Sequence, residues 1–328
     1  MVDTHYDLLS IAYCAYLSGN YAYLEKVSKY FHENNVNCVF ANLYFMSKEE
    51  MVEELHPKYY QEKVSVLEMF QKAKEVLDCY LPDTEILYSI EGADFITGPE
   101  ELEKLYDAGC DALILCWNTE SKYASGNRSD KGLTKEGREL IEKAISLGMG
   151  VDLSHANEAT FYDLINLVKE KQASGEDVCV YASHSNARSL CDRDRNLTDD
   201  QLEKIKEVNG FVGVFSNKNF VVKPADQKPD MDFRSHYLEH IHHIGNIVGL
   251  DNVMVATDDM DFCAWADPEY GQLAIYEYGL IVPNLILDLI KEFDMENAKN
   301  IIYGNAKEKI YNPIKSKRNE KEKDRGVK

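Results

Sequence analysis

Several features that mark common protein classes are missing from this chain of 328 residues. Its first residues have neither the basic stretch nor the apolar stretch of a secretory signal peptide. No segment approaches the roughly 18 consecutive apolar residues of a membrane-spanning helix. The eight cysteines include no Cys-x-x-Cys pair, and Cys38, Cys116 and Cys179 lie in apolar segments typical of buried strands. These absences predict a globular protein of a reducing compartment, and we expect it in the cytoplasm.

Positive charge is scarce as well. The chain has 36 Lys and Arg against 57 Asp and Glu, which gives a net charge of -21 and disfavours binding to nucleic-acid phosphates. A field of this sign suits a cation site, although solubility alone also explains it. No Gly-x-Gly-x-x-Gly follows the first strand-like segment, which disfavours a dinucleotide-binding fold. Without repeats or an evident boundary, we expect one catalytic domain over 1–312 and a charged, flexible tail over 313–328.

Short apolar segments alternate with amphipathic ones along the chain. Most strand-like segments are followed by a stretch with apolar residues at helical spacing. Strict alternation with a strand count near eight favours a (β/α)8 barrel over an open doubly wound sheet. We therefore predict an α/β fold, a single-domain barrel of the TIM type. The eight strand-like segments lie at 2–5, 37–42, 85–90, 111–116, 149–155, 178–184, 210–215 and 252–256.

Ionisable side chains stand where these segments end. Parallel α/β folds build their sites at the carboxyl ends of the strands, so in a barrel these side chains converge at one rim. Three imidazoles and three carboxylates without a thiolate suit zinc or another hard or borderline divalent metal. The sequence therefore predicts a metal centre at this rim. Its candidate residues are His5, Asp7, Glu91, His155, His184 and Asp258.

The spacing of these residues indicates their roles. His5 and Asp7 are two residues apart and can face the same side of an extended strand. Glu91 can bridge two metal ions, which sit about 3.5–4 Å apart in paired sites. Asp258 is the natural proton shuttle if no metal holds it. Taken singly, each residue has an ordinary explanation, such as capping a helix; their joint placement favours the metal centre.

A denser group of histidines occupies one predicted helix. His236 and His240 share a face of that helix, as metal-binding pairs do, and His242 and His243 follow. The barrel would place this helix in its outer layer, away from the strand ends. We therefore interpret these four histidines as structural.

The order of short motifs resembles the membrane (renal) dipeptidase family and its bacterial relatives. The resemblance runs from about residue 2 to residue 312, and motifs in the same order make it specific. The motifs are His-Tyr-Asp at 5–7, Ile-Glu-Gly-Ala at 90–93, Leu-Cys-Trp-Asn at 115–118, Gly-Leu-Thr at 132–134, Asp-Leu-Ser-His at 152–155, Ser-His-Ser at 183–185 and Arg-Asn-Leu at 195–197.

This resemblance implies a zinc-dependent dipeptidase with the metallo-dependent hydrolase type of barrel. By analogy with the family, His5 and Asp7 hold one zinc ion and His155 and His184 hold the other. Glu91 bridges the two ions, and a metal-bridging hydroxide attacks the peptide carbonyl. Two zinc ions are thus the expected cofactors, with another divalent metal as the alternative.

The resemblance also implies the residues that handle the substrate. Asp258 passes the proton to the leaving amine, Arg195 binds the terminal carboxylate of the dipeptide, and Trp117 and Asn118 contact the substrate. Some relatives have a histidine at the position of Trp117, and that histidine helps to hold the reacting carbonyl. This departure leaves the stabilisation of the reacting carbonyl and the substrate profile open, since an indole can donate a hydrogen bond but cannot take up a proton.

The last motif also departs from the family pattern. The family has Gly-x-Asp-Phe-Asp-Gly, whereas this chain reads Ala-Thr-Asp-Asp-Met-Asp at 256–261. We align Asp258 as the shuttle, with Asp259 or Asp261 as the fallback if the register differs.

The expected partner is a dipeptide, and dipeptides with a D-residue at the C-terminal position are included as an open question. No nucleic acid or membrane partner is expected, and homodimerisation is suggested by the resemblance alone. A second hypothesis is a related metal-dependent amidohydrolase acting on a non-peptide amide or lactam. A third is a non-catalytic barrel protein.

Overall fold

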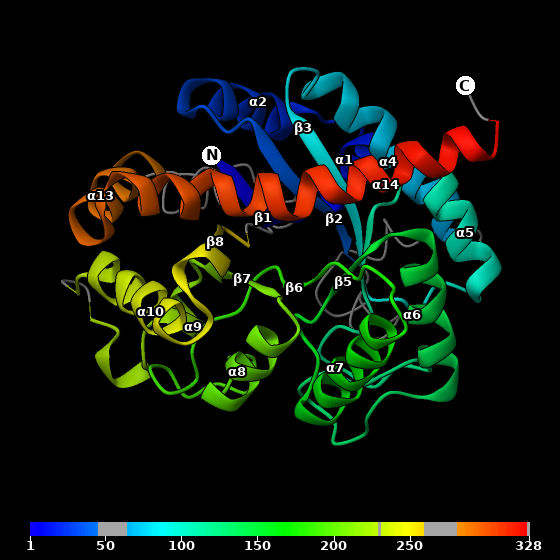
Figure 1. Ribbon diagram of the computed structural model, residues 1–328. Coiled ribbons are helices and arrows are strands. Elements are labelled where there is room, and N and C mark those ends of the chain that lie inside the picture. Colours follow the sequence, from blue (N-terminus) through cyan, green and yellow to red (C-terminus); the bar gives the residue numbers. More distant parts are fainter. Residues whose placement is uncertain (45–63, 229–230, 259–280, 327–328) are drawn as a thin grey trace.

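Eight parallel strands form the centre of the protein in the computed structural model, which describes residues 1–44, 64–228, 231–258 and 281–326 (Figure 1). Each strand pairs with the next one along the chain, so the sheet order is β1-β2-β3-β4-β5-β6-β7-β8. The strands are β1 (Val2–Tyr6), β2 (Cys38–Tyr44), β3 (Glu85–Glu91), β4 (Ala112–Ile114), β5 (Gly150–Asp152), β6 (Val180–Ala182), β7 (Phe211–Phe215) and β8 (Val253–Ala256).

The first and last strands meet and close the sheet. The backbone N–H of Asp258 donates to the carbonyl of His5 at 3.1 Å, and the Thr4 hydroxyl lies 3.1 Å from the carbonyl of Val255. The backbone N–H of Thr257 donates to the carboxylate of Asp3 at 2.9 Å, and its hydroxyl donates at 2.6 Å. These contacts confirm the predicted (β/α)8 barrel. They also place the carboxyl ends of β1 and β8 side by side at one rim.

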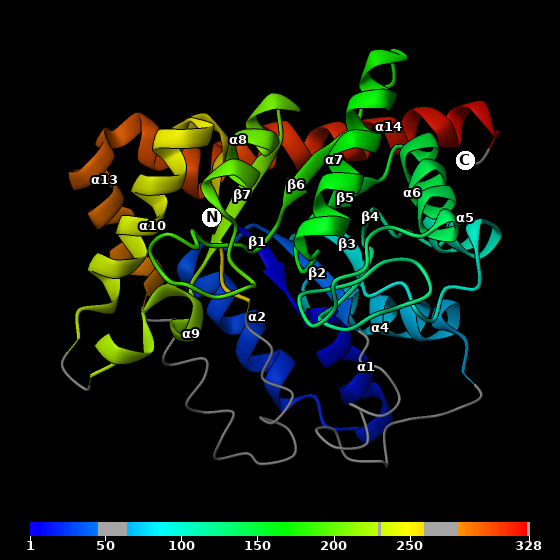
Figure 2. The same cartoon turned by 90° about the horizontal axis from the view of Figure 1, so that it is seen from below.

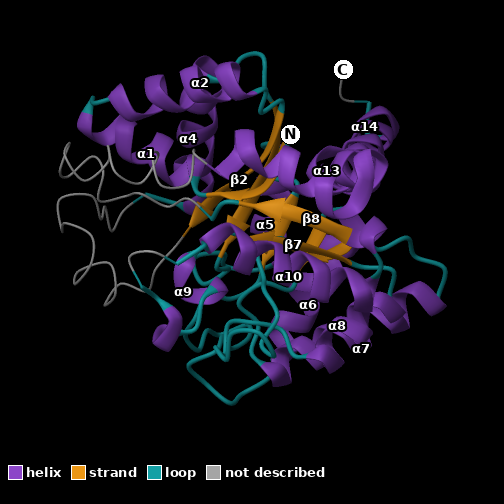
Figure 3. Cartoon of the chain, turned by 90° about the vertical axis from the view of Figure 1, so that its left-hand side faces the viewer, coloured by secondary structure: helices purple, strands orange, loops and turns teal. Residues whose placement is uncertain are grey.

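Helices surround the sheet, as Figure 3 shows. Two of them begin at side-chain caps: Thr134 accepts a hydrogen bond from Gly137 at 3.0 Å, and Thr198 forms a capping box with Gln201. The helices are α1 (Leu8–Ser18), α2 (Ala22–Asn34), α4 (Val66–Tyr80), α5 (Pro99–Asp107), α6 (Lys135–Leu147), α7 (Glu158–Ala173), α8 (Asp199–Glu207), α9 (Lys218–Val221), α10 (Phe233–Val248), α13 (Ile281–Lys299) and α14 (Asn312–Asp324). Shorter turns are η2 (Pro224–Asp226), η3 (Leu250–Asn252), η4 (Asn300–Gly304) and η5 (Lys307–Tyr311).

Alternation along the strands divides the core into two parts. In β2, Val39 and Ala41 pack toward the helices, whereas Cys38 and Phe40 belong to a cluster inside the barrel. This inner cluster also contains Ile314 of α14. Helix α14 therefore covers the barrel end where the strands begin, and Figure 2 shows it on the opposite side from α1.

The described part of the segment over 313–328 differs from the flexible tail that its charged composition predicted. Residues 313–324 lie in α14, and Arg318 is buried, donating to the carboxylate of Asp111 at 2.8 Å and to the carbonyls of Tyr106 and Cys110. The sequence did not indicate that Arg318 is buried, because its partner Asp111 lies about two hundred positions earlier. Charge alternation alone does not distinguish a solvated tail from a helix with buried partners.

Candidate metal centre

A cavity of about 330 Å³ opens at the carboxyl ends of the strands. The expected residues that line it include Asp7, Glu91, His155 and Asp258. His5 and His184 lie directly beneath, both fully buried. The barrel thus brings together all six candidate ligands of the predicted centre, although they span more than 250 positions of the chain.

A bulge in β1 decides that His5 faces the interior. Between Asp3 and Tyr6 the register with β2 shifts by one residue, because Asp3 pairs with Val39 and Tyr6 with Ala41. Without this extra residue, strict alternation from the inward-facing Val2 would turn His5 outward. Because Tyr6 packs outward, the two residues beside it, His5 and Asp7, both face the rim.

Glu91 occupies the middle of the centre at the end of β3. Its Oε2 lies 3.0 Å from Nε2 of His5, and its Oε1 lies 2.7 Å from Nε2 of His155 and 3.8 Å from Nε2 of His184. One oxygen of this carboxylate therefore faces His5, and the other faces His155 and His184. We call these the two halves of the site. This is the arrangement that a bridging ligand requires.

In each half, the ligand atoms lie close enough together to bind a metal ion of its own. Glu91, His155 and His184 offer ligand atoms that all lie within 4.8 Å of one another, and so do His5, Asp7 and Asp258. Nε2 of His155 lies only 2.9 Å from Nε2 of His184. Two ring nitrogens converging on one carboxylate oxygen fit a shared cation.

Electrostatics in the metal-free chain also fit a cation. Burial lowers the pKa of His5, but the carboxylates of Glu91, Asp7 and Asp258 outweigh it and raise that pKa to about 9. The site therefore holds a proton on His5 at neutral pH. A metal ion can replace that proton, because the negative charge of the nearby carboxylates attracts either cation.

The other two imidazoles are neutral. Burial, followed by the charge of Arg195, lowers the pKa of His155 to about 4, and burial holds the pKa of His184 well below its usual range. Nδ1 of His155 lies 2.9 Å from the amide oxygen of Asn118, which can only accept, so this Nδ1 carries the proton. Nε2 of His155 is then free of hydrogen and offers a lone pair to a metal.

Asp258 follows β8 in a left-handed conformation with φ 54°, which aspartate tolerates better than most residues. Its Oδ1 lies 3.7 Å from Nε2 of His5. Burial raises the pKa of Asp258 to about 7, with Glu91 adding to the rise and His5 opposing it. The fallback residues Asp259 and Asp261 lie outside the described residues.

Arg195 is buried in the wall of the cavity. Its guanidinium donates to the carbonyl of His184 at 3.1 Å and to the hydroxyl of Ser185 at 3.4 Å, and it lies over the ring of Phe215. These contacts fix the side chain while using two of its five donors. In the described structure, Arg195 can therefore present further donors to an anion in the cavity.

Trp117 and Asn118 line the same cavity. Trp117 packs edge-on against Tyr44 with ring centroids 5.1 Å apart, and the guanidinium of Arg128 lies 5.6 Å from its ring centre. Asn118 also supports a candidate ligand, because its side chain bonds His155. The loop that follows β4 thus contributes to the wall of the cavity.

Several supporting residues were missed by sequence reasoning. Asp3 ties β8 to β1, and the amide of Asn42 lies 3.0 Å from Nδ1 of His5. The Ser183 hydroxyl lies within hydrogen-bond distance of the His5 and His184 rings, and its backbone N–H donates to Asp152. A signal for them exists, since polar residues inside otherwise apolar strands require buried partners, but it does not say which partners.

The four histidines of α10 do not form a site. His236 lies near Glu239, His242 near Glu292 and His243 near Asp199, whereas His240 is buried. None of them belongs to a group of potential metal ligands in the described part of the chain. Their separate partners agree with the structural interpretation.

His240 predicts a pH effect on stability. Its Nδ1 accepts from the N–H of Ala187 and its Nε2 donates to the carbonyl of Val221, both at 3.0 Å. Burial lowers its pKa from 6.5 to about 4. The unfolded chain therefore binds this proton more readily, so the stability contribution is complete above pH 6.5 and is lost as pH falls toward 4, by up to about 3 kcal/mol.

Urea unfolding of the metal-free protein measures this effect. Between pH 7 and pH 4.5, we expect His240→Gln to lose less unfolding free energy than the parent chain. The comparison isolates His240, because His155 and His184 are present in both proteins. Identical pH dependence in the two proteins would contradict the assignment.

Among the described residues, no helix is both long enough and apolar enough to cross a membrane.

Comparison with known proteins gives matches along most of the chain. The family model of the membrane dipeptidases (peptidase family M19) matches residues 45–307. This range contains Glu91, His155, His184 and Asp258 but begins after His5 and Asp7. The barrel geometry, rather than the family match, is what brings His5 and Asp7 to the other ligands.

Two relatives match about half of the chain. An uncharacterized protein from the pqqA 5′ region of Klebsiella pneumoniae is 34% identical over 179 residues, which cover 52% of this chain and 62% of that protein. An uncharacterized dipeptidase of Schizosaccharomyces pombe is 32% identical over 199 residues, which cover 58% of this chain and 44% of that protein. The chain thus spans about half the length of these curated relatives.

A solved structure shares the fold. The crystal structure of a metallopeptidase from Rhodobacter sphaeroides, liganded with a phosphinate mimic of the dipeptide L-Ala-D-Ala, matches with a TM-score of 0.69. The match covers 96% of this chain and 98% of that chain at 21% sequence identity. At this identity the likeness establishes the common barrel.

Proposed function

Because this chain belongs to the membrane dipeptidase family, we propose that it is a metal-dependent dipeptidase that uses two zinc ions to hydrolyse dipeptides. The observation that carries the proposal is the convergence of three histidines and three carboxylates around Glu91 in one cavity. Ligands of this kind suit zinc, and a similar divalent ion is the alternative.

Each residue of the centre has a proposed place. His5 and Asp7 would hold one ion, His155 and His184 the other, and Glu91 would bridge them with its two oxygens. When bound, the ions would polarise the peptide carbonyl and supply a hydroxide nucleophile at neutral pH. The chain's own contribution is to fix the ligands: the β1 bulge turns His5 inward, and Asn118 holds the ring of His155.

We propose Asp258 as the proton carrier. Its carboxylate lies at the rim of the cavity, 3.7 Å from Nε2 of His5, and its backbone is anchored to the carbonyl of His5. From this position it can take a proton from the attacking water and return it to the leaving amine. The hydrogen bonds from Asp258 to His5 and from Thr257 to Asp3 hold the backbone here, so Asp258 keeps this position without a large movement.

Arg195 is proposed to select very short peptides. A planar guanidinium matches a carboxylate with two parallel hydrogen bonds, and the cavity of about 330 Å³ limits the length of the ligand. A longer peptide would have an uncharged amide where the dipeptide has its carboxylate. The phosphinate mimic of L-Ala-D-Ala bound to the Rhodobacter protein supports including D-residues at the C-terminal position.

Trp117 supports one alternative substrate class. The indole of Trp117 and the ring of Tyr44 form an aromatic wall in the cavity, which suits a flat cyclic amide or lactam. A related metal-dependent amidohydrolase would use the same metal centre on such a substrate.

A metal-dependence assay with a substrate panel tests the proposal. We expect chelation to abolish hydrolysis of dipeptides, and added zinc to restore it with about two ions bound per chain. The panel should contain L-L and L-D dipeptides, a tripeptide and cyclic amides. Preference for cyclic amides would support the alternative, and absence of both metal uptake and hydrolysis would favour a non-catalytic barrel protein.

The same assay tests whether Arg195 binds the terminal carboxylate of the dipeptide. For Arg195→Met we expect a rise in KM for free dipeptides, because a charge-assisted hydrogen bond contributes about 1.5–3 kcal/mol, or roughly 10- to 150-fold. Dipeptides amidated at the C-terminus should be poor substrates of the parent and change little in the variant. A uniform loss for both substrates would reject the assigned role.

A further inference from the structure

One buried hydroxyl lies between the two halves of the metal centre. Oγ of Ser183 is 3.1 Å from Nδ1 of His5 and 2.8 Å from Nδ1 of His184. His5 belongs to the half that contains Asp7 and Asp258, whereas His184 belongs to the half that contains His155. The rings of His5 and His184 stack with centroids 3.5 Å apart, so one side chain can serve both.

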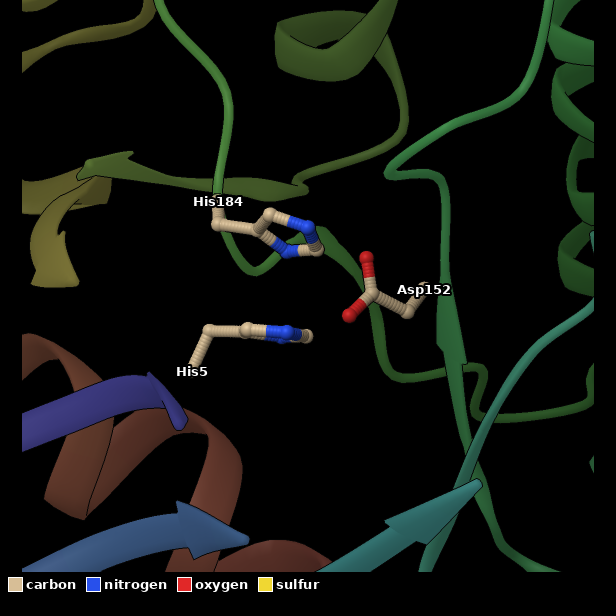
Figure 4. A group of neighbouring side chains, drawn as sticks. All are labelled: His5, Asp152 and His184. Atoms are coloured by element: carbon tan, nitrogen blue, oxygen red, sulfur yellow. The ribbon is translucent and has the colours of Figure 1, made fainter. Parts of the chain in front are cut away.

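The structure holds Ser183 firmly in this place. Its backbone N–H donates to the carboxylate of Asp152 at 3.0 Å, and its carbonyl accepts from the hydroxyl of Thr4 at 2.8 Å. The carboxylate of Asp152, which accepts from this N–H, points toward both histidine rings in Figure 4. Ser183 is 1% exposed, so water does not replace these contacts.

The number of donors and acceptors selects one arrangement of protons. A hydroxyl has one hydrogen to donate and two lone pairs. If Ser183 donates to Asp152, its lone pairs can accept from Nδ1–H of His5 and from Nδ1–H of His184. The amide nitrogen of Asn42 lies 3.0 Å from Nδ1 of His5 and donates to the carbonyl of Phe40 at 3.2 Å. The arrangement with hydrogen on Nδ1 of His5 requires a half-turn of this amide, which brings its oxygen to the N–H and gives up the hydrogen bond to Phe40.

We propose that Ser183 is a positioning residue shared by both metal sites: through its hydroxyl, supported by Asp152, it fixes His5 and His184 with their Nε2 lone pairs toward the two ions. The inference rests on the proposed function, because it requires a metal ion in each half. It also explains why His5, Asp152 and His184 lie close together: the Ser183 hydroxyl bonds both Nδ1 atoms, and the Ser183 backbone N–H bonds the carboxylate.

The proposal predicts that one substitution weakens both metal sites together. Full-length metal-free protein is titrated with zinc against a competing chelating dye, which yields two stepwise dissociation constants. For Ser183→Ala we expect both constants to rise about 10- to 100-fold, the usual effect of removing a partner of a metal-bound histidine. Activity at saturating zinc is measured in parallel.

Two variants provide matched comparisons. Ser154 is equally buried and lies 3.4 Å from Oγ of Ser183, but its hydroxyl accepts from the backbone N–H of His184 and contacts no ring nitrogen in the described structure. Ser154→Ala should keep both zinc constants within about threefold of the parent, since it leaves both rings supported. Asn118→Ala should weaken one constant only, because His155 is the one candidate ligand that the Asn118 side chain bonds among the described residues.

The outcomes separate this inference from the proposed function. Failure of the parent chain to bind zinc would reject the proposed function first. Two tight sites in the parent, together with a Ser183→Ala variant that weakens neither or only one, would overturn the shared role alone. Ring ¹⁵N spectra of the zinc-loaded parent need no variant: hydrogen on Nδ1 of both His5 and His184 is expected, and hydrogen on Nε2 of either ring overturns the proposal.

Discussion

Replacement of Glu91 by glutamine should lower kcat/KM for dipeptides by about 10³-fold or more, equivalent to about 4 kcal/mol of lost transition-state stabilisation. Glutamine has nearly the same shape but only one oxygen and no charge. The two oxygens of Glu91 face His5 and His155 separately, so an amide can serve one half of the centre at most. We expect bound zinc to fall below two ions per chain while the circular dichroism spectrum stays unchanged.

The same strand supplies a control for this variant. Glu85 begins β3 at the opposite end of the barrel and pairs with Lys307 at 2.6 Å. Glu85→Gln makes the same chemical change on the same strand, and its kcat/KM should match that of the parent. Retention of full zinc content and normal turnover by Glu91→Gln would refute the bridging role.

Replacement of Asp258 by asparagine should lower kcat by about 10²–10⁴-fold, the usual contribution of a positioned acid or base. Asparagine fits the left-handed backbone at this position as well as aspartate does, so the fold should not be strained. It can accept a hydrogen bond but cannot take up a proton at neutral pH. We therefore expect KM and zinc content to change little.

Zinc content separates a proton carrier from a metal ligand at this position. His5, Asp7 and Asp258 form a group with metal-binding geometry, so a ligand role for Asp258 predicts loss of one ion in Asp258→Asn. Asp199→Asn is the control, because Asp199 is half-exposed at the start of α8 and bonds His243 away from the cavity. Turnover of Asp258→Asn within about threefold of the parent would contradict both roles.

Most elements of the barrel were predictable because their periodicity is local. Helix α6, for example, begins after its cap Thr134 and ends at Gly148, which adopts the left-handed conformation. Helix α1 was not predicted, because residues 8–15 are all buried and show no polar face.

The sequence by itself determined which residue types stand at the strand ends, because the alternation of strands and helices and the order of motifs are properties of neighbouring positions. The tertiary structure decided how these residues act together. The bulge that turns His5 inward, the closure of β8 on β1 through Asp3, and the hydroxyl of Ser183 between two rings all depend on partners far apart in the chain. Hydrogen bonds and steric register fix such contacts, and neither can be read from spacing along one strand.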